Sequence, residues 1–305
     1  MRMDATEMSG GVRARRAAAL EGRPLGDTAV AVSLLGLGGN RLLTKRDGRR
    51  EAVRLVGRAL DLGVTFFDTA RLYASSEIFL GEGLEGRRDG IFLASKTHAR
   101  DRETARAQLH ETLRRLRTDR LDLWQLHDVR TDEEISRIFG AGGAMEALVE
   151  AREAGLVRYL GVTGHRSPGV IRRCLETFDF DTVMIPVNPA ERHYKSFLTS
   201  VLPVAADAGV GVIGMYAYWG GLVSGLDWFE TVEPFLRFAL SQPVSTVLVG
   251  CDSVRQLEEN VRYASRFAPM ARSEADALVR RMAPNASRLM YYKFPQGTPS
   301  SEVES

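Results

Sequence analysis

The sequence contains little cysteine. Its 305 residues include only Cys174 and Cys251, which excludes a disulfide-stapled fold and a zinc site built from cysteines. We therefore expect both thiols to be reduced in a cytoplasmic protein, and we expect no metal site.

A strong excess of charge of either sign is also missing. Lysine and arginine together number 41 against 39 aspartates and glutamates, which gives a formal net charge of +2. This balance, with no basic stripe interleaved with aromatic residues, excludes a dedicated nucleic-acid binder. Lysine itself is scarce, because the basic residues include only Lys45, Lys96, Lys195 and Lys293 beside the arginines.

Hydrophobic runs of the kind that cross a membrane are absent as well. Arg13, Arg15 and Arg16 are not followed by an apolar stretch, which argues against a secretory signal. The window Ala208–Leu226 has no charged residue, but it contains six glycines and lies within a repeating pattern. It predicts a buried strand followed by a loop, and we expect no membrane association.

The dominant feature that is present is a repeat. Short apolar or β-branched runs alternate with amphipathic segments at a spacing of about thirty residues. Eight runs predict strands, at Val30–Leu37, Val64–Thr69, Ile91–Lys96, Leu121–His127, Val157–Thr163, Thr182–Val187, Val210–Tyr216 and Val244–Gly250.

The amphipathic segments between these runs predict helices. They lie at Arg49–Leu62, Arg102–Leu116, Phe229–Leu240 and Ser253–Ala264, the last opened by an N-cap serine. A further segment, Glu134–Ala154, is interrupted by three glycines between positions 140 and 143.

This order of elements predicts a single-domain (β/α)8 TIM barrel over residues 23–295. Strands without polar alternation belong in a parallel sheet that is covered on both faces, and eight βα units close into a barrel. The alternative is an open doubly wound sheet, but the turn Gly36–Arg41 lacks the third glycine of a dinucleotide fingerprint. We expect residues 23–35 to form an N-terminal cap segment, and residues 1–22 and 296–305 to be disordered.

Four titratable residues stand at the predicted carboxyl ends of consecutive strands, where barrel enzymes keep their active sites. Asp68, Lys96 and His127 end strands two, three and four, and Tyr73 follows strand two. Taken singly, Asp68 could cap a turn, Tyr73 could be a packing aromatic and His127 a core histidine. Lys96 is different, because an ammonium after an apolar run needs a partner, and Asp68 is the natural one.

The chemistry of the four residues is coherent. A phenol titrates near pH 10 in water, and a nearby ammonium lowers that pKa. A carboxylate behind the ammonium keeps it charged, and a neutral imidazole can donate a hydrogen bond to a carbonyl oxygen. The set predicts a proton donor aimed at an oxygen that becomes alkoxide-like.

These segments resemble the aldo-keto reductases over roughly residues 23–265. The specific matches are Phe67–Tyr73, Ala94–Thr97 and Leu121–His127, and weaker ones are Leu35–Gly39, the Gly-Val-Thr-Gly-His run Gly161–His165, and Leu257–Asn260. The resemblance implies a barrel that binds NADPH across the strand ends and reduces carbonyl compounds. It implies Tyr73 as general acid, Lys96 and Asp68 as the pair that sets its pKa, and His127 as the group that orients the carbonyl.

The resemblance also implies a set of cofactor-binding residues. Tyr216 is expected to stack on the nicotinamide, and Glu259 and Asn260 match positions that contact the adenine. The complete predicted set is Gly39, Thr163, Asn188, Tyr216, Gly250, Gln256, Glu259 and Asn260.

Two parts of the family pattern are altered. Where the family holds the nicotinamide carboxamide with Ser-Asn and Gln, this chain has Thr163, Gly164 and Met184. We hypothesise that Asn188 or His165 supplies the missing contact. The family's 2′-phosphate clamp is replaced by Gly250, Cys251 and Gln256, so NADPH is expected from the family and NADH is possible.

The expected partner is a small-molecule carbonyl substrate, bound by a monomer or small homo-oligomer. His165, Tyr218 and Trp219 are expected to line an aromatic pocket, and the short loop after Tyr216 argues against tight enclosure. Two other functions stay open: a cofactor-binding sensor or regulatory barrel with little turnover, and a barrel enzyme with Lys96 as a Schiff-base lysine.

Overall fold

A computed structural model of the chain describes residues 20–294. The disorder predicted for residues 1–19 and 296–305 lies outside the described residues. Residues 20–22 belong to the folded part, because Leu20 is buried and the first strand begins at Gly22. The predicted extension was therefore too long by these residues, since a buried leucine gives them a place in the core.

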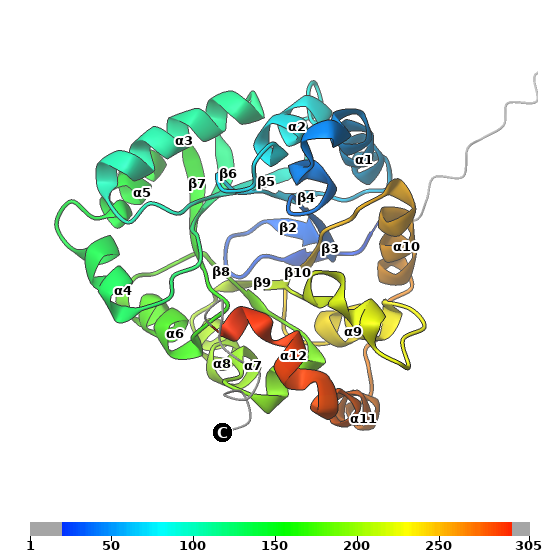
Figure 1. Cartoon of the computed structure of the whole chain (residues 1–305). Helices are drawn as coiled ribbons and strands as arrows, with labels where there is room; N and C mark the ends of the chain where they lie inside the picture. The colour runs from blue at the N-terminus through cyan, green and yellow to red at the C-terminus, as the bar shows by residue number, and fades with distance from the viewer. Residues whose placement is uncertain (1–19, 295–305) are drawn as a thin grey trace, which may run out of the picture.

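Eight parallel strands close into a barrel in the order β10-β3-β4-β5-β6-β7-β8-β9, and helices surround it (Figure 1). The barrel strands are β3 Leu35–Gly38, β4 Phe66–Asp68, β5 Phe92–Thr97, β6 Leu121–Leu126, β7 Val157–Thr163, β8 Thr182–Pro186, β9 Gly211–Met215 and β10 Thr246–Val249. Each predicted run supplies one of these strands, so the predicted (β/α)8 barrel is confirmed.

The first predicted run, Val30–Leu37, is divided between two sheets. Its beginning forms β2 (Ala31–Ser33), which pairs antiparallel with β1 (Gly22–Pro24), and its end enters the barrel as β3. Leu25 and Val32 of this hairpin are buried in the cluster that fills the barrel interior. The hairpin therefore caps the amino-terminal end of the barrel, because it supplies apolar side chains that close the open end of the strands.

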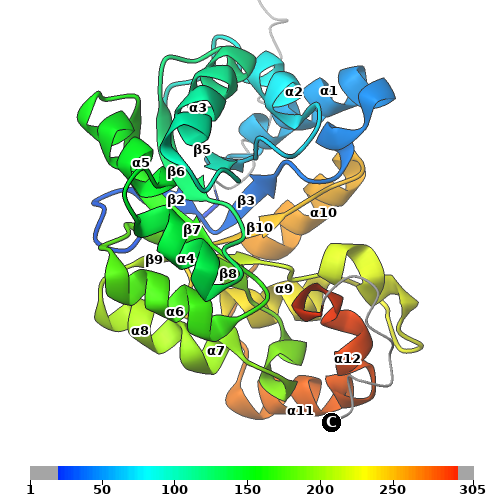
Figure 2. The same cartoon turned by 60° about the vertical axis from the view of Figure 1, so that its left-hand side comes forward.

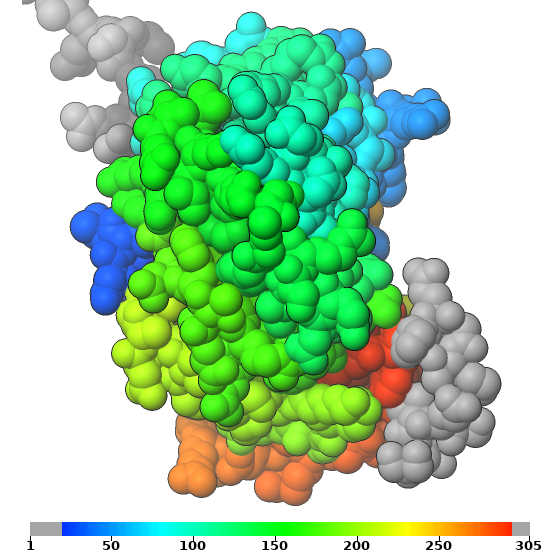
Figure 3. All heavy atoms as spheres, turned by 90° about the vertical axis from the view of Figure 1, so that its left-hand side faces the viewer, coloured from blue at the N-terminus to red at the C-terminus, as the bar shows by residue number. Residues whose placement is uncertain are grey.

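The outer layer consists of helices that follow the strands, and the cyan and green helices lie side by side over one face of the molecule (Figures 2 and 3). Their bounds are α1 Arg49–Asp61, α2 Ser76–Gly83, α3 Arg102–Leu116, α4 Asp132–Phe139, α5 Ala144–Glu153, α6 Pro168–Thr177, α7 Phe197–Ser200, α8 Leu202–Asp207, α9 Glu233–Leu240, α10 Val254–Ser265, α11 Arg272–Met282 and α12 Ala286–Leu289. Short 3₁₀ turns lie at η1 Leu42–Thr44, η2 Arg46–Gly48, η3 Pro189–His193, η4 Trp219–Gly225, η5 Ala283–Asn285 and η6 Tyr291–Lys293.

The helix boundaries follow local signals in the sequence. The glycines after Phe139 separate α4 from α5, as predicted. Ser253 caps α10, and its hydroxyl accepts a hydrogen bond from the Gln256 backbone N–H at 3.3 Å. The helix α9 begins at Glu233 and not at Phe229, because Pro234 fits only the first turn of a helix.

The uncharged window Ala208–Leu226 contains β9 and η4, as predicted. In the described part of the chain, no helix combines the length and the apolar composition needed to cross a membrane.

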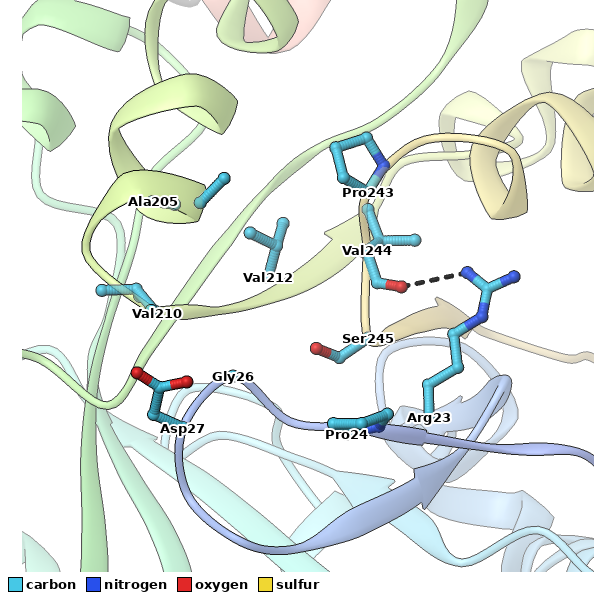
Figure 4. A pocket seen from close by; sticks show the side chains of 12 residues that line it. Arg23, Pro24, Gly26, Asp27, Ala205, Val210, Val212, Pro243, Val244 and Ser245 are labelled. Carbon is cyan, nitrogen blue, oxygen red and sulfur yellow. Dashed lines mark hydrogen bonds between the residues drawn. The ribbon is translucent and has the colours of Figure 1, made fainter.

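A shallow cavity of about 460 Å³ lies beside the hairpin at the amino-terminal end of the barrel (Figure 4). Arg23 and Asp27 are the ionisable residues in its lining. The Arg23 guanidinium donates hydrogen bonds to the carbonyl oxygens of Leu240 and Val244, both at 3.0 Å. The guanidinium of Arg23 therefore holds the loop that precedes β10 in place, and these hydrogen bonds occupy it in place of a ligand.

Candidate active site

The main cavity lies at the carboxyl ends of the barrel strands and has a volume of about 1070 Å³. It brings together most of the predicted site residues. Those in its lining are Gly39, Asp68, Tyr73, Lys96, His127, Thr163, His165, Tyr216, Tyr218, Gly250, Gln256, Glu259 and Asn260. Asn188 and Trp219 do not line it.

Lys96 and Asp68 form a buried ion pair at the floor of this cavity, with exposed fractions of 2% and 3%. The Lys96 Nζ also donates to the Thr69 carbonyl oxygen at 2.9 Å, and Gln125 Nε2 donates to Asp68 Oδ2 at 3.1 Å. Burial lowers the pKa of Lys96 and raises the pKa of Asp68, and the charge of each partner opposes that change. The predicted partnership of the two residues is therefore present.

Tyr73 lies on the loop between β4 and α2, facing His127 and Lys96. Its ring centroid is 5.5 Å from that of His127, in an edge-to-face arrangement, and 5.2 Å from the Lys96 Nζ. The loop is fixed by backbone hydrogen bonds from Tyr73 to Ala70 and from Ser76 to Tyr73. Residues from three consecutive strands and their loops thus converge on one point.

The predicted decrease in the phenol pKa is not found. Burial raises the pKa of Tyr73, and the carboxylates of Asp68 and Asp128 raise it further. The Lys96 ammonium, 5.2 Å from the ring centroid, does not offset these effects on the neutral phenol. Tyr73 therefore stays protonated around neutral pH, which is the form that a proton donor requires.

His127 follows β6, and its ring is only partly exposed, at the wall of the cavity. Burial holds its pKa well below the usual range, and the charge of Lys96 lowers it further. The imidazole is therefore neutral at pH 7. Its Nδ1 is buried and has no hydrogen-bond partner among the described residues. The exposed part of the ring lines the cavity, where it can still form a bond to a ligand.

Glu77 packs under the loop that carries Tyr73, and this role was not predicted from the sequence. It is fully buried on α2 and accepts hydrogen bonds from Ser95 at 3.0 Å and Thr112 at 2.7 Å. Arg71 and Arg115 lie 3.1 and 3.0 Å from its Oε2. A glutamate in a helix usually faces solvent, so no pattern in the sequence singles this one out.

The cofactor prediction for Asn188 was wrong. The side chain is fully buried; its amide nitrogen donates to the Tyr216 carbonyl and the Tyr292 hydroxyl, and its oxygen accepts from the Glu191 N–H at 3.1 Å. The strand β8 ends at Pro186, and Asn188 caps the turn that follows. In a strand, side chains point alternately to the two faces of the sheet. Asn188 lies beyond the end of β8, so this alternation does not determine where its side chain points.

The pocket prediction for Trp219 was also wrong. Its backbone has a φ of +47° at the start of η4, and its side chain is fully buried against Phe235, with ring centroids 5.6 Å apart. The turn directs this indole into the core beneath the C-terminal segment. Tyr218 does line the cavity, and its hydroxyl donates to Asn260 Oδ1 at 2.6 Å.

Basic side chains gather at the other end of the cavity, near the amino terminus of α10. Arg41 forms an ion pair with Asp252 and donates to the Gly220 carbonyl at 2.8 Å, while Lys45 lies 3.1 Å from Asp252. Arg255, on the first turn of α10, also lines the cavity. Helix amino termini and arginines favour phosphate groups.

The fold and the site define a (β/α)8 barrel with a cluster of acid–base groups at the carboxyl ends of its strands. Among residues 20–294, no group of three or more His, Cys, Asp or Glu side chains is placed to hold a metal ion.

Comparison with known proteins places this barrel in a family. The Aldo/keto reductase family model matches residues 34–231. This is more than half of the chain, which therefore belongs to the aldo/keto reductase family of oxidoreductases.

Individual relatives are distant. The chain is 26% identical to the uncharacterized oxidoreductase YqkF of Bacillus subtilis, over 80% of this chain and 90% of the relative. The aldo-keto reductase AKR11C1 from Bacillus halodurans (holo form) is 25% identical, with a TM-score of 0.72 over 86% of this chain and 96% of that one. An aldo/keto reductase from Klebsiella pneumoniae, in complex with NADP and acetate, is 22% identical with a TM-score of 0.70, covering 91% and 98% of the two chains. The last similarity concerns the fold alone.

Proposed function

We propose that this protein reduces an aldehyde or ketone to an alcohol with NADPH, and that Tyr73 is the general acid. The observation that carries the proposal is the convergence of Tyr73, His127, Lys96 and Asp68 in one cavity. A protonated phenol beside a neutral imidazole suits proton donation to a carbonyl oxygen.

The residues of the cavity fit a nicotinamide dinucleotide. The cavity extends from the Tyr73 end, where Tyr216 presents its ring, to the basic amino terminus of α10. The Tyr216 ring packs on Tyr292, with ring centroids 4.5 Å apart, and makes edge contacts with His165 and Tyr291 at 5.5 and 6.3 Å. These contacts hold the ring at the cavity wall, where a flat ligand can meet it. Gly39, Gly250, Gln256, Glu259 and Asn260 line the length between these ends.

NADPH is proposed over NADH because of the charges near α10. Arg41 and Lys45 pair with Asp252, and Arg255 lines the same cavity on the first turn of α10; this group of positive charges favours a 2′-phosphate.

The geometry of the site suggests a separate role in the reaction for each residue. The bound cofactor would supply the hydride. His127 would donate a hydrogen bond to the carbonyl oxygen, and Tyr73 would transfer its proton to that oxygen as negative charge develops there. Lys96, held by Asp68, would place a positive charge beside the phenolate that forms.

The use of Lys96 as a Schiff-base nucleophile is less compatible with its contacts. Its nitrogen is bound to Asp68 and to the Thr69 carbonyl, and a nucleophilic lysine must be neutral and free.

Substitution of Tyr73 by Phe tests the proposed acid. We expect Tyr73→Phe to reduce kcat by about 100-fold or more, because the proton donor is lost, with the Kd for NADPH changed by less than threefold. Steady-state reduction of an aldehyde panel and fluorescence titration with NADPH and NADH measure both quantities. Equal turnover in the variant would refute the assignment, and cofactor binding without turnover in the wild type would favour a sensor barrel.

A further inference from the structure

Asp128 combines burial, a left-handed backbone and an oxygen without a hydrogen bond. It follows His127 directly, is 7% exposed and lines the main cavity. Its φ of +52° is in the left-handed region, which aspartate adopts more readily than most non-glycine residues but usually with supporting contacts. No pattern in the sequence points to this residue.

Several contacts enforce this conformation. The Asp128 N–H donates to Thr163 Oγ1 at 2.8 Å, and its carbonyl accepts from Arg100 at 2.9 Å. Arg130 Nε donates to Asp128 Oδ2 at 2.6 Å. The side chain is therefore fixed through its backbone and through one of its two carboxylate oxygens.

The second oxygen, Oδ1, is left without a hydrogen-bond donor. It is buried and forms no hydrogen bond within residues 20–294. His165 Nε2 lies 3.1 Å away, but this contact does not form an aligned hydrogen bond. The other ring nitrogen of His165 lies 3.2 Å from the Tyr292 carbonyl oxygen, which can only accept, so the proton of a neutral His165 belongs on Nδ1. Nε2 of His165 then carries no proton, so two acceptors, His165 Nε2 and Asp128 Oδ1, face each other with no donor between them.

An unpaired carboxylate oxygen in a buried position is costly, and a bound donor removes that cost. We propose that Asp128 Oδ1 is a specificity-determining acceptor for a neutral hydrogen-bond donor of the bound ligands. Two groups have this chemistry: an amide N–H of the nicotinamide carboxamide, or a hydroxyl next to the substrate carbonyl. The inference rests on the proposed function.

The position of Asp128 suits either donor. It adjoins His127, whose ring centroid lies 5.5 Å from that of Tyr73, and it contacts His165, whose ring centroid lies 5.5 Å from that of Tyr216. A group bound at Oδ1 would therefore lie near both the proposed acid and the ring proposed to hold the cofactor. Gly164 and Met184, at the altered family positions, have no side-chain donor or acceptor strong enough to do the same.

The substitution Asp128→Asn reverses the polarity at this point while keeping the shape. Asparagine tolerates a positive φ, and Arg130 selects the amide oxygen, so the NH₂ group takes the place of Oδ1. The matched control is Glu134→Gln, which makes the same chemical change in a carboxylate at the same cavity whose Oε2 is already bonded to the Arg130 N–H at 2.7 Å.

Two assays separate the two donors. The first measures Kd for NADPH and for 2′,5′-ADP, which lacks the nicotinamide. The second measures kcat/KM for 2-hydroxypropanal and for propanal. If the donor is the carboxamide, Asp128→Asn weakens NADPH binding about tenfold or more and leaves 2′,5′-ADP unchanged. If it is a substrate hydroxyl, the preference for 2-hydroxypropanal over propanal falls by a similar factor.

The inference is overturned if wild-type enzyme is active and Asp128→Asn changes neither the NADPH affinity nor the substrate preference. It is also overturned if Glu134→Gln produces the same changes. Failure of the proposed function is distinct, because wild-type protein would then neither bind NADPH nor reduce an aldehyde. Circular dichroism and thermal unfolding of both variants check that each is folded.

Discussion

At the scale of single residues, Lys96 and Asp68 hold opposite charges out of water. Replacement of one partner leaves the other as an uncompensated buried charge, which typically costs about 3–5 kcal/mol. We expect Lys96→Met to lower the free energy of unfolding by about that amount and to abolish reduction. Urea unfolding and steady-state kinetics measure the two effects.

A double substitution separates stability from chemistry. Asp68→Asn in the Lys96→Met background removes the stranded charge, so we expect much of the stability to return while activity stays lost. Recovery of activity together with stability would mean that Lys96 acts only through folding and not on Tyr73.

The site was predictable from the sequence where a residue ends a regular strand. Asp68, Lys96 and His127 lie at the carboxyl ends of their strands, so strand prediction alone brings them to one rim. Asn188 and Trp219 lie in turns, where side-chain direction depends on dihedral angles that no periodicity encodes. The pKa of Tyr73 depends on burial and on Asp128, and both emerge only from the folded chain.

At the scale of elements, α2 and α3 approach closely because Gly81 has no side chain. A Cβ at this position would lie 2.7 Å from the backbone oxygens of Arg115 and Leu116. Backbone atoms of a packed helix cannot move aside easily, so we expect Gly81→Ala to lower the free energy of unfolding by about 1–2 kcal/mol. Thermal or urea unfolding measures this change.

Gly57 in α1 provides the matched control. A Cβ there would meet nothing within 4 Å, so we expect Gly57→Ala to stabilise the protein by about 0.5–1 kcal/mol through helix propensity. If both substitutions had the same sign, close packing of α2 on α3 would not be the reason for the glycine.

The elements themselves divide into those that the sequence specifies and those that packing decides. Long amphipathic segments such as α1 and α3 and uniform apolar runs such as β7 were predicted closely. In the hairpin β1–β2, β1 was not predicted and β2 was expected only as the beginning of a barrel strand, because three-residue strands are too short for a period of two to appear. Its pairing depends on the apolar space at the end of the barrel, which Leu25 fills.

At the scale of the whole molecule, the buried histidines make stability depend on pH. Burial places the pKa of His127 well below 6.5, and the pKa of His165 is also lowered by burial. Well above pH 6.5 both residues are neutral in the folded and unfolded chains and contribute no pH dependence. Below pH 6.5 the unfolded chain binds protons that the folded chain does not, so the free energy of unfolding falls with decreasing pH.

The variant His127→Gln isolates one part of this effect, because glutamine does not titrate. Asp68 and Glu191, whose pKa values burial raises, act in the opposite direction on acidification, but they are present in both proteins and their effects cancel in the comparison. Between pH 6.5 and pH 5.5, we expect the free energy of unfolding of the wild type to fall by about 1 kcal/mol more than that of the variant. Urea unfolding at several pH values measures it. A difference that stays constant over this range would mean that His127 accepts a proton in the folded barrel as readily as in water, and a neutral imidazole beside Tyr73 would then be ruled out under acidic conditions.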